Sequence, residues 1–147
     1  MKISVMQPYF FPYLGYFQLI AASDIFVILD DVQFIDKGWI NRNRILHPAV
    51  EKKWNYINVP LSKRNQFSKI KDVKIDNSKN WKSTILGKIS HYKPWAPNYY
   101  FLKNLLENYF ENDFESINKL CEFTISSICS LFDIKTKILL FSELGLN

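Results

Sequence analysis

Residues 3–17 read Ile-Ser-Val-Met-Gln-Pro-Tyr-Phe-Phe-Pro-Tyr-Leu-Gly-Tyr-Phe, and they carry the strongest structural signal in the chain. Its apolar start predicts a buried strand, and the two prolines that follow hold a loop rich in aromatic side chains. Gly15 then opens an amphipathic helix. A strand that leads through a tight loop into a helix places backbone N–H groups where they can bind an anion or a polar ligand. We therefore expect Gln7, Tyr9 and Gly15 to contact a substrate.

A second apolar run, residues 25–29, predicts a strand buried on both faces, as in a parallel sheet. With the first strand and helix it forms a βαβ unit, whose crossover should be right-handed. Apolar residues at helical spacing predict three further helices. We therefore expect residues 1–147 to form a single α/β domain, Rossmann-like, with a mainly parallel sheet and a helical C-terminal part. The expected strands are 3–7, 25–29, 42–46, 54–59, 70–75 (short, or an edge) and 138–141, the third and fourth forming a hairpin, and the expected helices are 15–23, 78–92, 98–110 and 113–132.

The net charge of +5 is unevenly placed along the chain. The segment 37–93 holds fourteen Lys and Arg residues against three acids, a balance of +11, while the flanks on either side sum to −3 each. Such a segment favours an anionic partner, and a solvated lysine-rich surface is the alternative. The anionic partners that such a charge fits are nucleic acid, a phosphate-bearing substrate and an acidic lipid, and we expect a small anionic substrate and disfavour nucleic acid. A nucleic-acid-binding module built on the 37–93 segment is kept as an alternative function.

The two cysteines, Cys121 and Cys129, lie eight apart in one expected helix. At a rise of 1.5 Å per residue their Cα atoms would be about 12 Å apart, too far for a disulfide. Free thiols are typical of a reducing compartment, so we expect a cytoplasmic protein. With only two histidines and no CxxC or HExxH motif, we expect neither a metal site nor a cofactor. Polar residues interrupt the signal-like N-terminus, and no apolar stretch approaches the roughly 20 residues of a membrane span.

The sequence Asp30-Asp31-Val32-Gln33 follows the second apolar strand at its carboxyl end. In open α/β sheets, ligands bind at that edge. Adjacent strand residues point to opposite faces, so at most one of the two aspartates faces a given pocket. The aspartate that faces the pocket is suited to act as a base, as a ribose contact or as a metal ligand, and the other is suited to cap the loop. We expect Asp30 or Asp31 to act as a catalytic base and Gln33 to contact the substrate. The alternative is that both aspartates only make hydrogen bonds within the loop.

The sequence Asn41-Arg42-Asn43-Arg44 is a further candidate segment. On an extended chain Arg42 and Arg44 share one face, and Asn41 and Asn43 share the other. Two guanidinium groups can bind phosphate or carboxylate in a bidentate manner, and asparagine amides can orient a sugar. We expect all four to bind the substrate, with an exposed basic strand as the alternative.

In order and spacing these segments resemble the WbqC-like protein family. The resemblance is carried by residues 6–17, 30–34, 39–45 and 59–60. It implies a bacterial protein of O-antigen or other surface-polysaccharide biosynthesis. It also implies a transferase acting on a nucleotide-activated or amino sugar, with acyl or aminoacyl transfer as the candidate reaction.

Members of that family usually continue beyond the length of this chain. The resemblance therefore implies that residues 1–147 are the N-terminal portion of a longer domain. On this view the chain is a fragment, one product of a split gene whose partner chain supplies the missing C-terminal half, or a short paralogue. A ligand-binding fragment without catalytic activity is the alternative function.

A fainter similarity is to nucleotidyltransferases with an HxGH loop, in which a strand also leads through a proline loop to a helix start. Here Tyr13 and Tyr16 stand where those enzymes have histidines, so the imidazoles that stabilise phosphate are absent. The similarity implies a Rossmann-like fold more than it implies adenylyl transfer.

Overall fold

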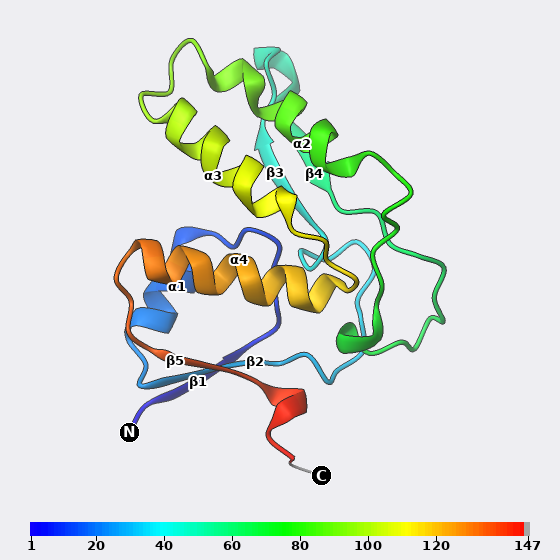
Figure 1. The fold of residues 1–147 in the computed structure, drawn as a ribbon, viewed down its shortest axis with the longest axis vertical. Helices are drawn as coiled ribbons and strands as arrows, with labels where there is room; N and C mark the ends of the chain where they lie inside the picture. Colours follow the sequence, from blue (N-terminus) through cyan, green and yellow to red (C-terminus); the bar gives the residue numbers. More distant parts are fainter. Residues whose placement is uncertain (146–147) are drawn as a thin grey trace.

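The computed structural model describes residues 1–145, and its central feature is a three-stranded parallel sheet (Figure 1). The strands are β1 (Ile3–Met6), β2 (Ile25–Ile28) and β5 (Lys137–Leu140), in the order β1-β2-β5. Val5, Val27 and Leu139 lie side by side across the sheet. The predicted α/β class with a parallel sheet is confirmed.

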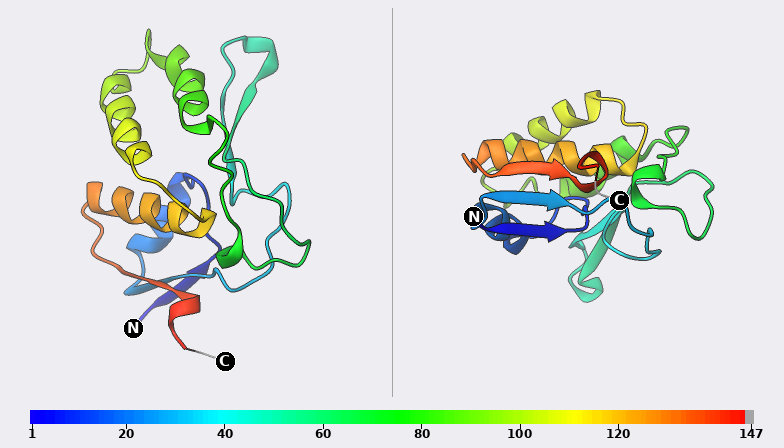
Figure 2. Two further views of the ribbon diagram at one scale, coloured as in Figure 1. Left: turned by 45° about the vertical axis from the view of Figure 1, so that its right-hand side comes forward. Right: turned by 90° about the horizontal axis from the view of Figure 1, so that it is seen from below.

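Helices α1 (Leu14–Ala21) and α4 (Ile117–Leu131) pack on the same face of this sheet (Figure 1). Crossovers between parallel strands are right-handed as a rule, so two crossovers that step in one direction place their helices on one side. The chain steps from β1 to β2 through α1, and onward from β2 to β5 with α4 as the last helix before β5. Tyr16 of α1 contacts Phe26 of β2 edge to face, with ring centroids 5.3 Å apart. Within residues 1–145 no helix covers the opposite face (Figure 2, right).

A hairpin and two further helices lie beyond α4 (Figure 1). Strands β3 (Arg42–Leu46) and β4 (Trp54–Asn58) pair antiparallel, as predicted. Helix α2 (Trp81–Ile89) packs against β4 and against α3 (Tyr99–Glu111). The loop after β1 and the hairpin contribute Phe10 and Ile57 to the same cluster of buried apolar side chains. The loop and the hairpin are therefore anchored in a common core.

The segment 70–75 is not the strand that its sequence predicts. Ile70–Asp72 form a 3₁₀ turn, and the residues that follow make only isolated bridges. Ile70 and Val73 are both fully buried, and their spacing of three residues matches the 3₁₀ repeat rather than the two-residue repeat of a strand.

The predicted helix over 78–92 is shorter in the structure. It begins at Trp81 and ends at Ile89, and Ser90–Tyr92 form a 3₁₀ turn. Within residues 1–145 no helix has the length and apolar character needed to cross a membrane.

Both cysteines are buried and unpaired, as their spacing predicts. The Sγ atom of Cys121 donates to the carbonyl oxygen of Ile40 at 3.4 Å. Burial raises the pKa of the Cys121 thiol. A thiol that stays protonated is a poor nucleophile, so these contacts give Cys121 a packing role.

Candidate functional site

A pocket of about 320 Å³, the loop pocket, opens between the loop after β1 and strand β3. It is lined by Tyr9, Pro12, Tyr13, Trp39, Asn43 and Arg44. The rings supply apolar walls, and the arginine supplies a cation. Tyr9, Asn43 and Arg44 are all residues that the sequence assigns to substrate binding, and the fold brings them together from two distant segments.

Asn43 fastens the loop to the hairpin. Its Nδ2 atom donates to the carbonyl oxygens of Phe10 at 3.0 Å and Phe11 at 2.6 Å. Phe11 has a φ of 49°, in the left-handed region that non-glycine residues seldom adopt. A backbone hydrogen bond from Phe10 N–H to the carbonyl oxygen of Trp39, at 3.0 Å, adds a second link. Both amide hydrogens of Asn43 are thus used within the protein, and Asn43 shapes the pocket wall.

Tyr13 and Tyr16 fill the space around the turn that leads into α1. The hydroxyl of Tyr16 donates to the carbonyl oxygen of Gln7 at 2.9 Å, and burial raises the pKa of that hydroxyl. A Cβ atom added to Gly15 would lie 2.6 Å from Cε2 of Tyr13, so the Tyr13 ring rests on the first turn of the helix. The ring occupies the place beside the helix start where the sequence predicts a ligand. Neither Gln7 nor Gly15 is among the residues that line the loop pocket.

Replacing Gly15 with alanine is expected to weaken ligand binding in the loop pocket several-fold without destabilising the protein. The new methyl group displaces the exposed Tyr13 ring, while alanine favours the helix by about 0.5–1 kcal/mol. Ligand titration and urea unfolding of the same preparation measure both effects. Gly87→Ala is the matched control, because a Cβ there meets nothing within 4 Å. Loss of stability with unchanged binding would contradict the expectation.

Asn41 and Arg42 hold the base of the hairpin. The Nδ2 atom of Asn41 donates to the carbonyl oxygen of Val59 at 2.9 Å. Arg42 donates from Nε to the carbonyl oxygen of Gly38 at 3.0 Å and from Nη2 to the carbonyl oxygen of Lys37. These contacts occupy both side chains, and neither lines the loop pocket.

Arg44 is the arginine that reaches the pocket. Its guanidinium carbon lies 5.0 Å from the ring centroid of Trp39 and 4.9 Å from that of Trp54, so two indoles flank it. Arg42 also stacks on Trp39, at 5.8 Å, which agrees with the predicted shared face. Within residues 1–145 no carboxylate forms an ion pair with Arg44. Its hydrogen-bond donors are therefore available to an anion.

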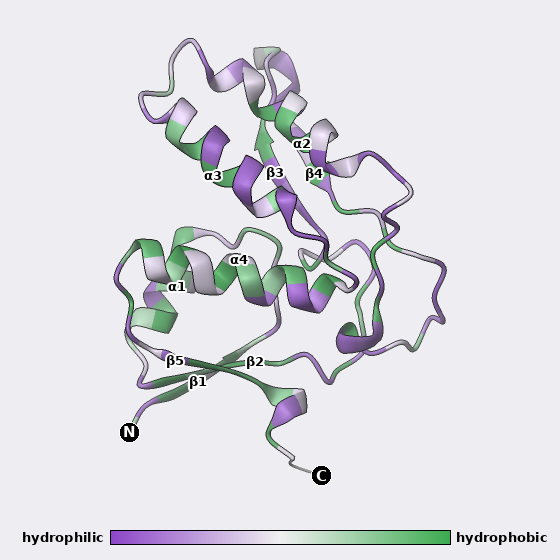
Figure 3. Ribbon diagram, in the orientation of Figure 1, coloured by the Kyte–Doolittle hydropathy of each residue, from purple (hydrophilic) through white to green (hydrophobic). Residues whose placement is uncertain are grey.

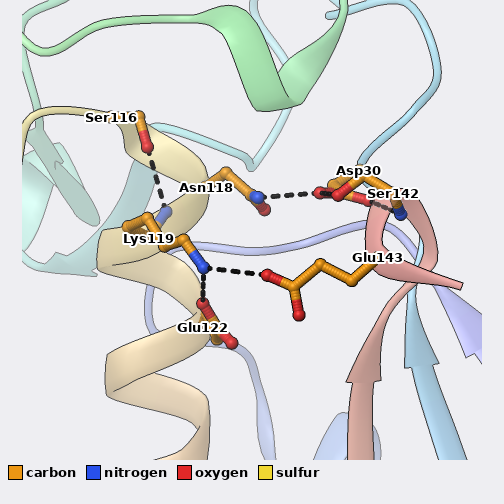
Figure 4. A network of polar contacts seen from close by, with 7 residues as sticks. All are labelled: Asp30, Ser116, Asn118, Lys119, Glu122, Ser142 and Glu143. Atoms are coloured by element: carbon orange, nitrogen blue, oxygen red, sulfur yellow. Dashed lines mark hydrogen bonds and ion pairs between the residues drawn. The ribbon is translucent and has the colours of Figure 1, made fainter.

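Asp30 is fully buried and makes three hydrogen bonds (Figure 4). Its Oδ2 atom accepts from Asn118 Nδ2 at 2.8 Å and from the Ser142 hydroxyl at 2.6 Å. Its Oδ1 atom accepts from the Ser142 backbone N–H at 2.9 Å. Asp30 thereby joins the end of β2 to α4 and to the turn after β5. These contacts favour a structural role, and its action as a base stays a prediction.

Asp31 points to a different group of partners. Its Oδ1 atom lies 2.8 Å from Lys69 Nζ and 3.0 Å from Lys71 Nζ. Hydrogen bonds from Lys69 and Lys71 lower the pKa of this carboxyl group. A carboxylate held in this way is a weak base. Gln33 donates to the carbonyl oxygen of Gln66 at 3.2 Å, and neither Asp31 nor Gln33 lines the loop pocket.

The lowered pKa of Asp31 gives stability a dependence on pH. Since the folded pKa lies below the unfolded value of about 4, the ion pairs stabilise the protein fully above that pH. This stabilisation is lost as the pH falls through the folded pKa. In urea unfolding from pH 2 to 7, the advantage of wild type over Asp31→Asn should shrink below about pH 4. A constant difference across this range would show that the ion pairs are not responsible.

Three pocket residues, Pro12, Tyr13 and Trp39, are absent from the residues that the sequence assigns to the site. Pro12 and Tyr13 belong to the same loop as residues that the sequence does assign to the site. Their place in that loop was the signal that could have identified them as site residues. Trp39 precedes Arg44 by five residues, and only the bend before β3 brings its ring back onto that arginine.

The positive charge of the segment 37–93 is partly neutralised within the protein. Acids from outside the segment pair with five of its cations, namely Asp36 with Arg64, Asp31 with Lys69 and Lys71, Glu115 with Lys74, and Asp113 with Lys82. Nucleic-acid affinity depends on cations that can neutralise phosphates. The ion pairs therefore disfavour this segment as a nucleic-acid surface.

The sequence profile of the WbqC-like protein family matches residues 7–147. A curated relative, the uncharacterized protein Rv1507c of Mycobacterium tuberculosis, is 29% identical over 145 residues. The match covers 93% of this chain and 58% of the relative, so the chain spans less than two thirds of the relative's length. No solved structure matches the chain, and the likeness to HxGH nucleotidyltransferases is not shown. Because the family profile matches nearly the whole sequence, the chain belongs to the WbqC-like protein family.

Proposed function

We propose that the chain binds the phosphate-bearing part of a nucleotide-activated sugar in the loop pocket, as part of a transferase of surface-polysaccharide (O-antigen-type) biosynthesis. Membership of the WbqC-like family suggests a role in polysaccharide biosynthesis. The ligand assignment rests on one observation, the guanidinium group of Arg44 held between two indoles at a pocket without a carboxylate partner among residues 1–145.

The pocket walls fit this chemistry. A planar guanidinium group binds phosphate oxygens in pairs, and stacking on aromatic rings fixes its orientation. Tyr9, Tyr13 and Trp39 present ring faces on which a sugar or a base can lie. A volume of about 320 Å³ is near the lower end for ligand pockets and accommodates a phosphate and one ring. We infer that the rest of such a ligand extends into solvent or against a partner.

For the reaction of this transferase, we propose acyl or aminoacyl transfer to an amino sugar. In that reaction the acceptor amine or hydroxyl attacks the acyl carbon, a base takes its proton, and the acyl carrier leaves. Asp30 and Asp31 are the bases that the sequence proposes. Both carboxyl groups make their contacts away from the loop pocket, so this role requires a rearrangement around the substrate.

A second candidate function is ligand binding without turnover. It is favoured by the composition of the pocket, since no Asp, Glu or His is among its lining residues in the described part of the chain. Product formation by the purified chain from a nucleotide sugar and an acyl donor would decide for the transferase. Binding of the nucleotide sugar with no product would decide for ligand binding without turnover.

Titration of intrinsic tryptophan fluorescence tests the ligand assignment. UDP and UDP-N-acetylglucosamine are expected to quench the fluorescence, and free N-acetylglucosamine at equal concentration is not. A Trp39→Phe variant should lose most of the signal, because Trp39 lines the pocket. Equal affinity for the neutral sugar would contradict the assignment. Single-strand DNA binding that falls steeply with salt would favour the nucleic-acid alternative.

A further inference from the structure

One face of the parallel sheet is bare. In the view from below, the three strands lie in front of the helices (Figure 2, right). Phe26 and Ile28 point to the covered side, where both are fully buried. By strand alternation and register, the bare face consists of Ile3, Val5, Ile25, Val27, Lys137 and Leu139.

This bare face is apolar. The strands are mostly in the hydrophobic colours in Figure 3, and Lys137 is the one charged residue among the six. Ile3 is 54% exposed and Val5 is 49% exposed, whereas Val27 between its neighbours is 6% exposed. Parallel sheets occur almost always with both faces covered, and their strands are accordingly apolar on both sides. A layer is therefore expected on this face.

The topology explains why residues 1–145 do not supply that layer. Both crossovers step in the same direction across the sheet, so α1 and α4 fall on one side. The hairpin, α2 and α3 lie beyond α4 on that same side (Figure 1). The curated relative Rv1507c is longer, and 42% of its length has no counterpart in the match.

We propose that the bare face is the docking surface for the polypeptide that corresponds to the unmatched part of Rv1507c. The chemistry of the face calls for amphipathic helices, with an apolar stripe over Val5, Val27 and Leu139. Within residues 1–145 Lys137 forms no ion pair. We therefore expect the docking polypeptide to carry an acidic residue opposite Lys137, at the edge of the apolar stripe. None of the six residues lines the loop pocket, so this interface does not depend on the proposed ligand.

Thiol labelling of two proteins tests the proposal. One is this chain with Val5→Cys, and the other is intact Rv1507c with cysteine at the equivalent position of its first strand. Leu131→Cys is the matched control, because Leu131 is 47% exposed at the end of α4, away from the bare face. Cys121 and Cys129 are buried and contribute little background in the native chain.

We expect the cysteine at position 5 to react rapidly in this chain and about tenfold or more slowly in intact Rv1507c, because the additional layer protects it. The control position is expected to react at similar rates in both proteins. Equal rapid labelling at position 5 would overturn the proposal. It would also be overturned if this chain sediments as a dimer that Val5→Lys dissociates, because a second copy would then be the occupant.

Discussion

A protein in which alanine replaces Arg44 is expected to bind a nucleotide sugar about 10- to 100-fold more weakly than wild type. Hydrogen bonds to charged groups contribute about 1.5–3 kcal/mol, and 1.4 kcal/mol changes Kd tenfold. Trp39 and Trp54 hold the guanidinium group in place before the ligand arrives, so little side-chain entropy is lost on binding. Isothermal titration with UDP-N-acetylglucosamine measures the difference.

Two variants separate the role of Arg44 from the general charge of the hairpin. Lys52→Ala removes one positive charge from the exposed turn of the same hairpin and should leave Kd unchanged. Arg44→Lys keeps the charge but loses the planar group, and it should recover only part of the affinity. Equal losses in the Arg44→Ala and Lys52→Ala proteins would mean that the pocket does not select the anion.

Replacing Asp30 with alanine is expected to lower the free energy of unfolding by about 2–5 kcal/mol. The substitution leaves the Asn118 amide and the Ser142 donors without their acceptor, and each buried donor without a partner costs about 1–3 kcal/mol. A loss of this size is a large fraction of the 5–15 kcal/mol that is usual for a folded domain. Urea unfolding followed by circular dichroism measures it.

Asp31→Ala is the natural comparison, because its carboxylate pairs with lysines at the surface and its removal should cost much less. The same pair of variants tests the sequence-based prediction of a catalytic base. If Asp30→Ala kept the unfolding midpoint of wild type and abolished transferase turnover, Asp30 would be a catalytic residue rather than a structural one.

The strands and the hairpin could be predicted because each leaves a local signal. A mainly apolar run marks β1 and a continuous apolar run marks β2, and turn residues separate the two strands of the hairpin. The strand β1 is not buried as its sequence predicts, because it lies at the edge of the sheet and exposes Ile3 and Val5. The prediction of a strand over 70–75 is wrong because three buried residues at mixed spacing suit both a strand and a 3₁₀ turn. Only the surrounding packing selects between the two.

The contacts of the candidate site were harder to predict because they join distant parts of the chain. Asp30 meets Asn118 at a separation of 88 residues and Ser142 at a separation of 112 residues. Local pattern indicates that a polar residue follows a strand, but it does not reveal which partners the fold brings to it. The charge of the segment 37–93 is a similar case, because its partners lie in the acidic flanks.

The amide of Asn43 has a consequence for the energetics of recognition. By bonding the carbonyl oxygens of Phe10 and Phe11, it gives the two walls of the loop pocket a fixed separation before any ligand is present. Ordering one free residue costs about 1–2 kcal/mol, and that cost is already met during folding. The pocket is thus preorganised. The affinity of a ligand depends on how well the ligand fits the pocket rather than on the conformational entropy lost by ordering the chain around it.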